Sequence, residues 1–331
     1  MREHQALFSG SVLTIAVLLT ATTPIAAQEE PPVENAAAET PSSAEEAKPP
    51  TSQPMALQSL IPTLPDYSGD LWKRSFLTGD WGGERTKLAE QGILFDLTVT
   101  QNGQGNAHGG KNTSGAFEYG GAADYTLRLD TARMGLWPGG LITLHGETQM
   151  GQSTNGNVGS LAPSNFKSLL PFPGDPGITT LSEFYITQAL SEKLVLIAGK
   201  IDPMAGDRNV FAGDASHTTQ FMNTAFNVNP VLFPAAPYTT MAAGVILLPT
   251  KWLTISTLVT DNDPNGAART TGFNTAFHGR NWMSITQEYD IKVKLFGKPG
   301  NQRFGWFYTN RDFIDFAGDS RLPVPGRTQR V

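Results

Sequence analysis

The chain has 331 residues, no cysteine and a formal net charge of −6, which excludes a small exported domain held together by disulfide bonds. Its 34 glycines and 18 phenylalanines accompany a hydrophobic fraction of 39%, a composition that favours a β protein with many turns. The acidic excess precedes residue 71, so the rest of the chain gives no reason to expect a nucleic-acid partner.

Residues 1–27 have the organisation of a secretory signal peptide. Arg2 precedes an apolar stretch from Val12 to Leu19, and small residues follow up to Ala27. We therefore predict export of the protein and cleavage before Gln28. The apolar stretch is shorter than the roughly 20 residues that a transmembrane helix needs, and no later stretch of the sequence approaches that length.

Residues 28–70 are predicted to form a disordered linker rich in Pro, Ala and Glu, with few large apolar side chains to bury. Eight acidic residues against Lys48 give this segment a charge of −7, and because residues 1–27 are neutral, residues 71–331 carry +1. A solvated spacer is the simplest interpretation. Anchoring to a cell wall or to a partner is the alternative.

A short helix is predicted from Asp80 to Gln91. Asp80 is a suitable N-cap, and Gly92 stands where a helix commonly ends in the left-handed conformation. Because an isolated helix of about 10 residues is marginally stable in water, we expect this one to pack against another element.

From Ile93 onward, apolar and polar residues alternate with a period of two, the pattern of a half-buried strand. About nine strands of roughly 9 to 15 residues are predicted, a length that suits tilted membrane-spanning strands. They cover residues 93–101, 117–131, 141–150, 180–190, 194–202, 238–248, 252–260, 283–295 and 303–309.

Two all-β architectures produce such two-faced strands. A soluble antiparallel sandwich buries one face of each strand and wets the other. A membrane barrel turns the apolar face to lipid and the polar face to an aqueous lumen. Export, strand length, the absence of a helical layer, and aromatic residues near strand ends favour the second: an all-β, antiparallel transmembrane β-barrel of the outer-membrane porin type.

Four stretches of the sequence carry a family resemblance. They are TGDWGGERTKLAEQGI, LRLDTARMGLWPGG, LSEFYITQALSEKLVLIAGKIDP and FNVNPVLFPAAPYTTMAAGVILLPTKWLTISTLVTDNDPN. In this order they resemble the carbohydrate-selective porins of the OprB type, over about residues 71–320. The resemblance implies a sixteen-stranded outer-membrane barrel that admits glucose and related sugars by passive diffusion, with the short helix at the periplasmic end leading into the first strand.

The chain departs from the family pattern in its strand number. About nine strands are predicted where the family barrel has sixteen, and the sequence ends at Val331. We therefore divide the chain into a signal peptide (1–27), a disordered linker (28–70) and a porin β-barrel domain (71–331) that is shorter at its carboxyl end than the family barrel.

Sugar selectivity requires hydrogen-bond donors and acceptors that converge at a constriction. The polar face of the strands offers them, because Arg presents a fork of donors and carboxylates accept from hydroxyl groups. We expect Arg128 and Glu147 to contribute most, and the alternative for each residue is an ion pair that only supports the lumen wall. The predicted constriction residues are Arg128, Glu147, Glu118, Asp124, Asp130, His145, Glu183, Tyr185, Lys200, Asp202 and Arg208.

The long segment between Pro203 and Pro237 is expected to fold inward and narrow the pore, since long loops are commonly functional. Its further candidates are Phe211, His217 and Phe221.

No cofactor or metal is predicted. The stretch DNDPNG, Asp261 to Gly266, matches the start of a calcium loop, but Gly272 stands where that loop needs a bidentate Glu. Sequence motifs of hydrolases and phosphate-binding enzymes are absent, and a glycosidase built on paired strand carboxylates is a distant alternative.

The expected partners are outer-membrane lipid, small sugars and, as an option, further copies of the chain. The alternatives to a sugar-selective porin are a non-selective porin and an exported β-sheet protein with a binding or structural role.

Overall fold

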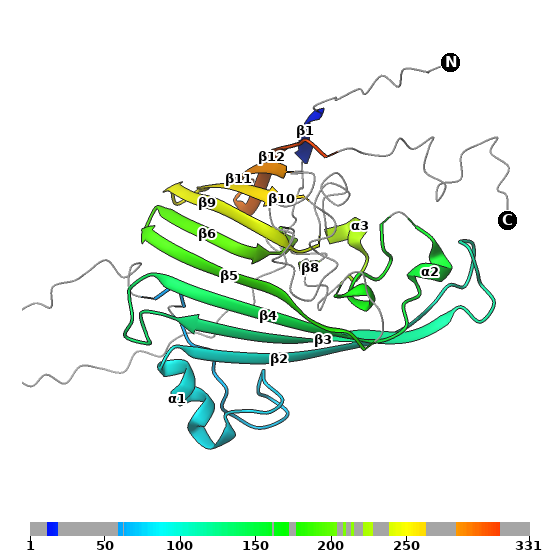
Figure 1. Ribbon diagram of the computed structural model, residues 1–331, viewed down its shortest axis with the longest axis horizontal. Helices are drawn as coiled ribbons and strands as arrows, with labels where there is room; N and C mark the ends of the chain where they lie inside the picture. The colour runs from blue at the N-terminus through cyan, green and yellow to red at the C-terminus, as the bar shows by residue number, and fades with distance from the viewer. Residues whose placement is uncertain are drawn as a thin grey trace, which may run out of the picture.

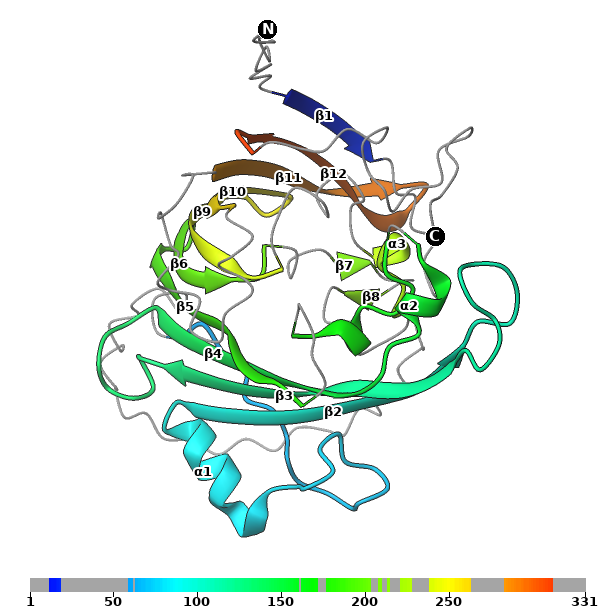
Figure 2. The same ribbon diagram turned by 45° about the vertical axis from the view of Figure 1, so that its right-hand side comes forward.

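The structure is a computed structural model that describes residues 12–18, 59–61, 63–160, 162–171, 177–203, 208–209, 213–214, 221–227, 238–262 and 283–311. Its main feature is one antiparallel sheet in which ten strands follow the order β1-β12-β11-β10-β9-β6-β5-β4-β3-β2. The sheet is strongly curved (Figures 1 and 2). Within the described residues, no helix is long and apolar enough to cross a membrane.

Nine of these strands are the nine predicted ones, with small differences at their ends. Each pairs antiparallel with its sheet neighbours. They are β2 (Ile93–Gly105), β3 (Phe117–Asp130), β4 (Gly140–Gly151), β5 (Thr179–Ser191), β6 (Leu194–Ile201), β9 (Thr240–Thr250), β10 (Leu253–Asp261), β11 (Met283–Leu295) and β12 (Lys298–Thr309).

The tenth strand, β1 (Val12–Leu18), comes from the apolar stretch of the predicted signal peptide. It pairs antiparallel with β12, from Val12 opposite Thr309 to Leu18 opposite Arg303. The signal peptide and its cleavage remain predictions. Cleavage before Gln28 would remove β1 and leave β12 as the edge of the sheet.

The strands have two different faces, as their alternation predicts. On β2 the odd residues Phe95, Leu97 and Val99 are exposed to between 39% and 53%. The even residue Asp96 lies on the opposite face and pairs with Arg128 of β3. An extended apolar surface of this kind is unfavourable in water and suits contact with lipid.

The connections differ between the two ends of the sheet. At one end, called here the short-turn end, β5 and β6, β9 and β10, and β11 and β12 are joined by two residues each. At the other, the long-loop end, lie the 27 residues 152–178 between β4 and β5 and the longer segment between β6 and β9. The short elements of these loops lie on the concave side of the sheet (Figure 2). They are α2 (Asn155–Val158), η3 (Lys167–Leu169), β7 (Arg208–Asn209), β8 (Gly213–Asp214) and α3 (Thr224–Asn227).

The predicted helix is present but shorter than expected. A 3-10 turn, η2 (Trp81–Gly83), precedes α1 (Glu84–Glu90). Gly83 has φ of +97°, which prevents a continuous helix from Asp80. Gly83, and not the predicted Asp80, therefore occupies the N-cap position of α1. The Asp80 carboxylate still accepts from the Thr86 backbone N–H in the first turn, at 2.8 Å.

The helix packs against β2, as its low intrinsic stability requires (Figures 1 and 2). Ala89 of α1, Leu94 of β2 and Tyr67 form a buried cluster, joined by the partly buried Ile61, Leu64 and Phe76. Gly92 ends the helix with φ of +89°, and a Cβ there would lie 2.6 Å from the Asp130 carbonyl oxygen. The conformation and the close approach therefore both require glycine at this position.

Candidate functional site

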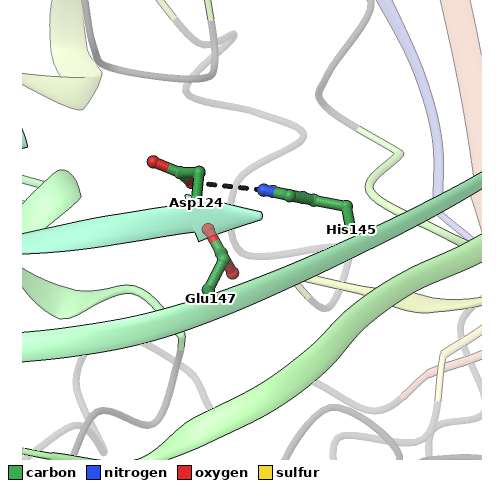
Figure 3. Close-up of side chains that lie close together, drawn as sticks. All are labelled: Asp124, His145 and Glu147. Carbon is green, nitrogen blue, oxygen red and sulfur yellow. Dashed lines mark hydrogen bonds and ion pairs between the residues drawn. The ribbon is translucent and has the colours of Figure 1, made fainter. Parts of the chain in front are cut away.

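Charged side chains converge on the concave face of the sheet, where β3, β4 and β5 lie side by side. His145 projects from β4 between two carboxylates: its Nε2 lies 3.2 Å from Asp124 Oδ1, and its Nδ1 lies 2.9 Å from Glu183 Oε2. Figure 3 shows Asp124, His145 and the neighbouring Glu147. An imidazole protonated on both nitrogens donates to both carboxylates at once.

A β-bulge places a further donor in this region. The register changes from His145 opposite Glu183 to Gly146 opposite Leu181, so Ser182 is the extra residue. The Ser182 hydroxyl donates to Glu147 Oε2. The bulge therefore turns two consecutive side chains of β5 toward the charged residues of β4.

Tyr238, just before β9, completes the surroundings of Glu147. Its hydroxyl donates to Glu147 Oε2 at 2.7 Å. Burial, together with the Glu147 charge, raises the pKa of Tyr238 well above its usual value, so the phenol keeps its proton. Glu147 itself is fully buried, and it contacts other protein groups in place of water.

The loop between β4 and β5 covers these side chains and adds a lysine. Lys167 of η3 is 1% exposed, and its Nζ lies 2.6 Å from Asp124 Oδ1. Two other residues adjoin: Lys200 Nζ donates to the Leu181 carbonyl at 3.0 Å, and Glu183 Oε1 accepts from the Asp202 backbone N–H at 3.0 Å. We call Asp124, His145, Glu147, Lys167 and Glu183 the inner-face cluster.

Neutral hydrogen bonds hold the β4–β5 loop in place. Asn165 donates to Asn102 Oδ1 at 2.8 Å and to Gln104 Oε1 at 2.7 Å, both on β2. Gln149 of β4 donates to the Ser168 carbonyl at 2.6 Å. Phe166 packs edge-on against Tyr238, with ring centroids 5.7 Å apart.

The structure distributes the predicted constriction residues over several places. Asp124, His145, Glu147 and Glu183 belong to the inner-face cluster, and Lys200 and Asp202 adjoin it. Arg128 and Tyr185 occupy the next row of the same face toward the short-turn end, on either side of Thr143. Whether these side chains contact sugar remains a prediction.

Three predicted residues lie elsewhere. Asp130 is fully buried at the short-turn end, where its Oδ1 accepts from the backbone N–H groups of Ala132 and Arg133. It therefore supports a turn and does not face the inner-face cluster, because β3 ends at this residue. Glu118 lies at the long-loop end and accepts from Asn157 at 3.2 Å. Arg208 is in the two-residue strand β7, and its side chain is outside the described part.

In the described part, the β4–β5 loop covers the inner-face cluster, and the sequence pattern had not indicated this loop. The described part of residues 203–237 packs on it: Phe166 N–H donates to the Met222 carbonyl at 2.9 Å, and Thr224 N–H to the Pro163 carbonyl at 3.1 Å. Phe221 is half-exposed, while Phe211 and His217 lie outside the described residues.

Four residues of this region were not predicted: Asn165, Lys167, Ser182 and Tyr238. Ser182 and Tyr238 lie within stretches that resemble the family, but nothing in those stretches marks them as site residues. For Asn165 and Lys167, the signal was the length of the segment from 152 to 178, with its asparagines and a single lysine.

Asp124, His145 and Glu147 also have the geometry of a metal-binding group, since one ligand atom of each lies within 4.8 Å of the others. The Lys167 ammonium already pairs with Asp124, and both His145 nitrogens face carboxylates. Because protein cations occupy these positions, we interpret the group as an ion-pair network. Of the calcium-like stretch, only Asp261 and Asn262 are described, and Asn262 donates to Ser284 and Thr309.

Comparisons with known proteins identify a family and a fold. The family described as "Carbohydrate-selective porin, OprB family" matches residues 114–328. The curated protein "Putative porin QuiX" of Acinetobacter baylyi is 33% identical over 72 residues, which cover 21% of this chain and 16% of that protein. The high-pH structure of Pseudomonas putida OprB aligns with a TM-score of 0.61 and 21% identity, over 71% of this chain and 56% of that chain.

These matches differ in what they establish. The family match covers well over half of the residues. The likeness to the solved structure, at 21% identity, establishes the fold alone, and the chain spans 56% of that solved chain's length.

Proposed function

Because the chain belongs to the carbohydrate-selective porin family, we propose that it forms an outer-membrane channel for the passive diffusion of glucose and related sugars. The observation that carries the proposal is the inner-face cluster. It is a set of hydrogen-bonding side chains on the concave face of a sheet whose other face is apolar. A lumen that passes sugars needs such groups, and a lipid-facing wall needs apolar ones.

The partly exposed members of this face are the groups that meet a solute. The side chains of Arg128, His145 and Glu183 are 34%, 18% and 13% exposed, respectively. They offer guanidinium donors, an imidazole and a carboxylate acceptor to the hydroxyl groups of a sugar. Glu147 was expected to contribute most, together with Arg128, but its side chain is fully buried. In this proposal Glu147 and the buried Lys167 position the partly exposed groups and do not touch the solute.

The remaining parts of the proposal follow from the two faces of the sheet. The apolar outer face contacts outer-membrane lipid, and the predicted signal peptide directs export. Assembly of several copies is compatible with the proposal. A diffusion channel catalyses no reaction, so the carboxylates serve as hydrogen-bonding groups.

The test is planar-bilayer conductance of the full chain, produced with its own leader and purified from the outer-membrane fraction in detergent. We expect stable conductance steps that increasing glucose attenuates, and mannitol and raffinose provide solutes of other shape and size. Steps that no sugar attenuates support a non-selective porin, and absence of steps from folded protein contradicts a channel.

A third outcome would identify the remaining alternative, a protein that is not a channel. If the protein is recovered in the water-soluble fraction and stays monodisperse without detergent, the exposed apolar face does not contact lipid. That result favours an exported β-sheet protein with a binding or structural role.

A further inference from the structure

The loop that carries Lys167 is held to the sheet by neutral contacts in addition to the ion pair between Lys167 and Asp124. Asn165 and Ser168, its neighbours, bind β2 and β4 through neutral hydrogen bonds. Phe166 and Leu170, on either side of η3, are buried in an apolar cluster with Tyr238. Burying an ammonium group is costly unless it is paired, so a neutral side chain would fasten this loop at lower cost.

The inner-face cluster is rich in acceptors. Asp124, Glu147 and Glu183 contribute three carboxylates, whereas Lys167 and His145 are its cationic members. Asp124 Oδ2 and Glu147 Oε1 are buried without a hydrogen-bond partner among the described residues. Lys167 therefore supplies much of the positive charge in this region, whose carboxylates would otherwise attract cations.

The neighbouring lysine does not replace it. Lys200 Nζ donates to the Leu181 carbonyl at 3.0 Å, while Lys167 Nζ binds a carboxylate oxygen directly, at 2.6 Å. The adjoining residues Lys200 and Asp202 add one lysine and one carboxylate, so four carboxylates are opposed by two lysines and by His145. Removal of Lys167 leaves the four carboxylates opposed by Lys200 and His145.

We infer that Lys167 is a specificity-determining residue of the channel: from the β4–β5 loop, it neutralises the inner-face cluster, so that the lumen passes uncharged solutes and does not concentrate cations. The inference rests on the proposed function. The proposed function gives the kind of solute that passes, and the inference adds the residue that selects solutes by their charge. A charge in a narrow pore of low dielectric acts on permeating ions even when it does not touch them.

The test is the zero-current potential across a planar bilayer with a potassium chloride gradient. The parent chain is expected to discriminate weakly between K⁺ and Cl⁻. Lys167→Met keeps the length of the side chain and removes its charge. This variant is expected to raise the K⁺/Cl⁻ permeability ratio by about threefold or more near 0.1 M salt, with a smaller effect at 1 M, where the Debye length is about 3 Å.

Two further variants isolate the charge. Lys111→Met removes an exposed lysine from the β2–β3 loop and is expected to leave the ratio unchanged. The double variant Lys167→Met/Asp124→Asn removes one charge of each sign and is expected to restore the parent ratio. If Lys167→Met does not form channels, comparison of Asp124→Asn with the double variant measures the Lys167 charge alone.

The outcomes separate this inference from the proposed function. A parent channel whose permeability ratio is unaffected by Lys167→Met overturns the inference and leaves the sugar channel intact. If conductance increases and the K⁺/Cl⁻ permeability ratio does not change, the role of Lys167 is to hold the loop in place. That result also overturns the inference. Absence of channels from the folded parent chain contradicts the proposed function and, with it, the role of Lys167.

Discussion

Two groups of ion pairs share the polar face of the sheet, and they are covered in different ways. At the short-turn end, Arg85 of α1 bonds Asp96 of β2 at 2.9 Å and lies over the Tyr67 ring, 4.0 Å from its centroid. In the inner-face cluster, Lys167 bonds Asp124 from a loop that begins more than twenty residues after it in the chain.

The segments that cover the two groups of ion pairs explain what each group contributes. Arg85 lies among aromatic side chains from residues 67–81, close to it in sequence, and it fastens the helix to the sheet. The inner-face cluster is covered by a loop held by polar contacts, and His145 and Glu183 keep part of their surface exposed. Arg85 therefore stabilises the fold, whereas the inner-face cluster combines buried charges with the partly exposed side chains of His145 and Glu183.

The largest effect is expected from Arg85→Met. The change removes the ion pair with Asp96 and the hydrogen bond to the Phe95 carbonyl. Because Asp96 keeps Arg128 as a partner, we expect a loss of about 3 kcal/mol of unfolding free energy, at the low end for a broken buried pair. The measurement is thermal unfolding in detergent, followed by tryptophan fluorescence.

Lys87→Met is the matched control for Arg85, because Lys87 pairs with Glu84 on the exposed side of the same helix. Exposed pairs of this kind contribute at most about 0.5 kcal/mol. If Arg85→Met alters glucose attenuation and leaves the unfolding temperature unchanged, Arg85 does not serve mainly to stabilise the fold. The two groups of ion pairs would then not differ in role.

A smaller effect on stability, and a larger one on the pore, is expected from Asn165→Ala. The change removes hydrogen bonds to Asn102, Gln104 and the Ser168 backbone N–H, about 2 kcal/mol in sum. The β4–β5 loop should then leave the sheet and increase single-channel conductance. Asn301→Ala, at an exposed position of β12, is the control, and equal conductance of both variants would show that the loop does not narrow the pore.

Tyr238→Phe is expected to cost about 1 kcal/mol at neutral pH, because Glu147 loses one donor. Burial raises the pKa of Tyr238 in the folded protein, so its contribution is complete below about pH 10, where the unfolded tyrosine keeps its proton. Above that pH the unfolded state ionises first, and stability falls. Urea unfolding at pH 7, 9 and 11 should show a shallower decline for the variant; identical slopes would contradict the buried donor.

The smallest change is expected from Glu183→Gln. Glutamine keeps an acceptor for sugar hydroxyls and loses the charge that faces His145. We expect the half-attenuating glucose concentration to rise by about threefold, less than 1 kcal/mol, with little change in unfolding temperature. Glu192→Gln, in the exposed β5–β6 turn, should behave as the parent chain. A loss of stability without a change in attenuation would place Glu183 with Arg85 among the structural residues.

The strand pattern was predictable because alternation is local. The Phe95, Leu97 and Val99 row lies on the exposed face, and Asp124, His145 and Glu183 lie together on the other, as their spacing indicates. Asp130 shares the parity of Asp124 and was predicted to join them. Its position at the end of β3, beside the turn that it caps, was not visible in the alternation.

The sequence by itself determined the nine strands, their two faces, the short helix and the family, because each depends on residues that are neighbours in the chain. Only the tertiary structure decided which polar residues meet. Lys167 reaches Asp124 across 43 positions, and Tyr238 reaches Glu147 across 91. Such contacts depend on how a long loop folds back over the sheet, and a period of two along one strand does not encode that path.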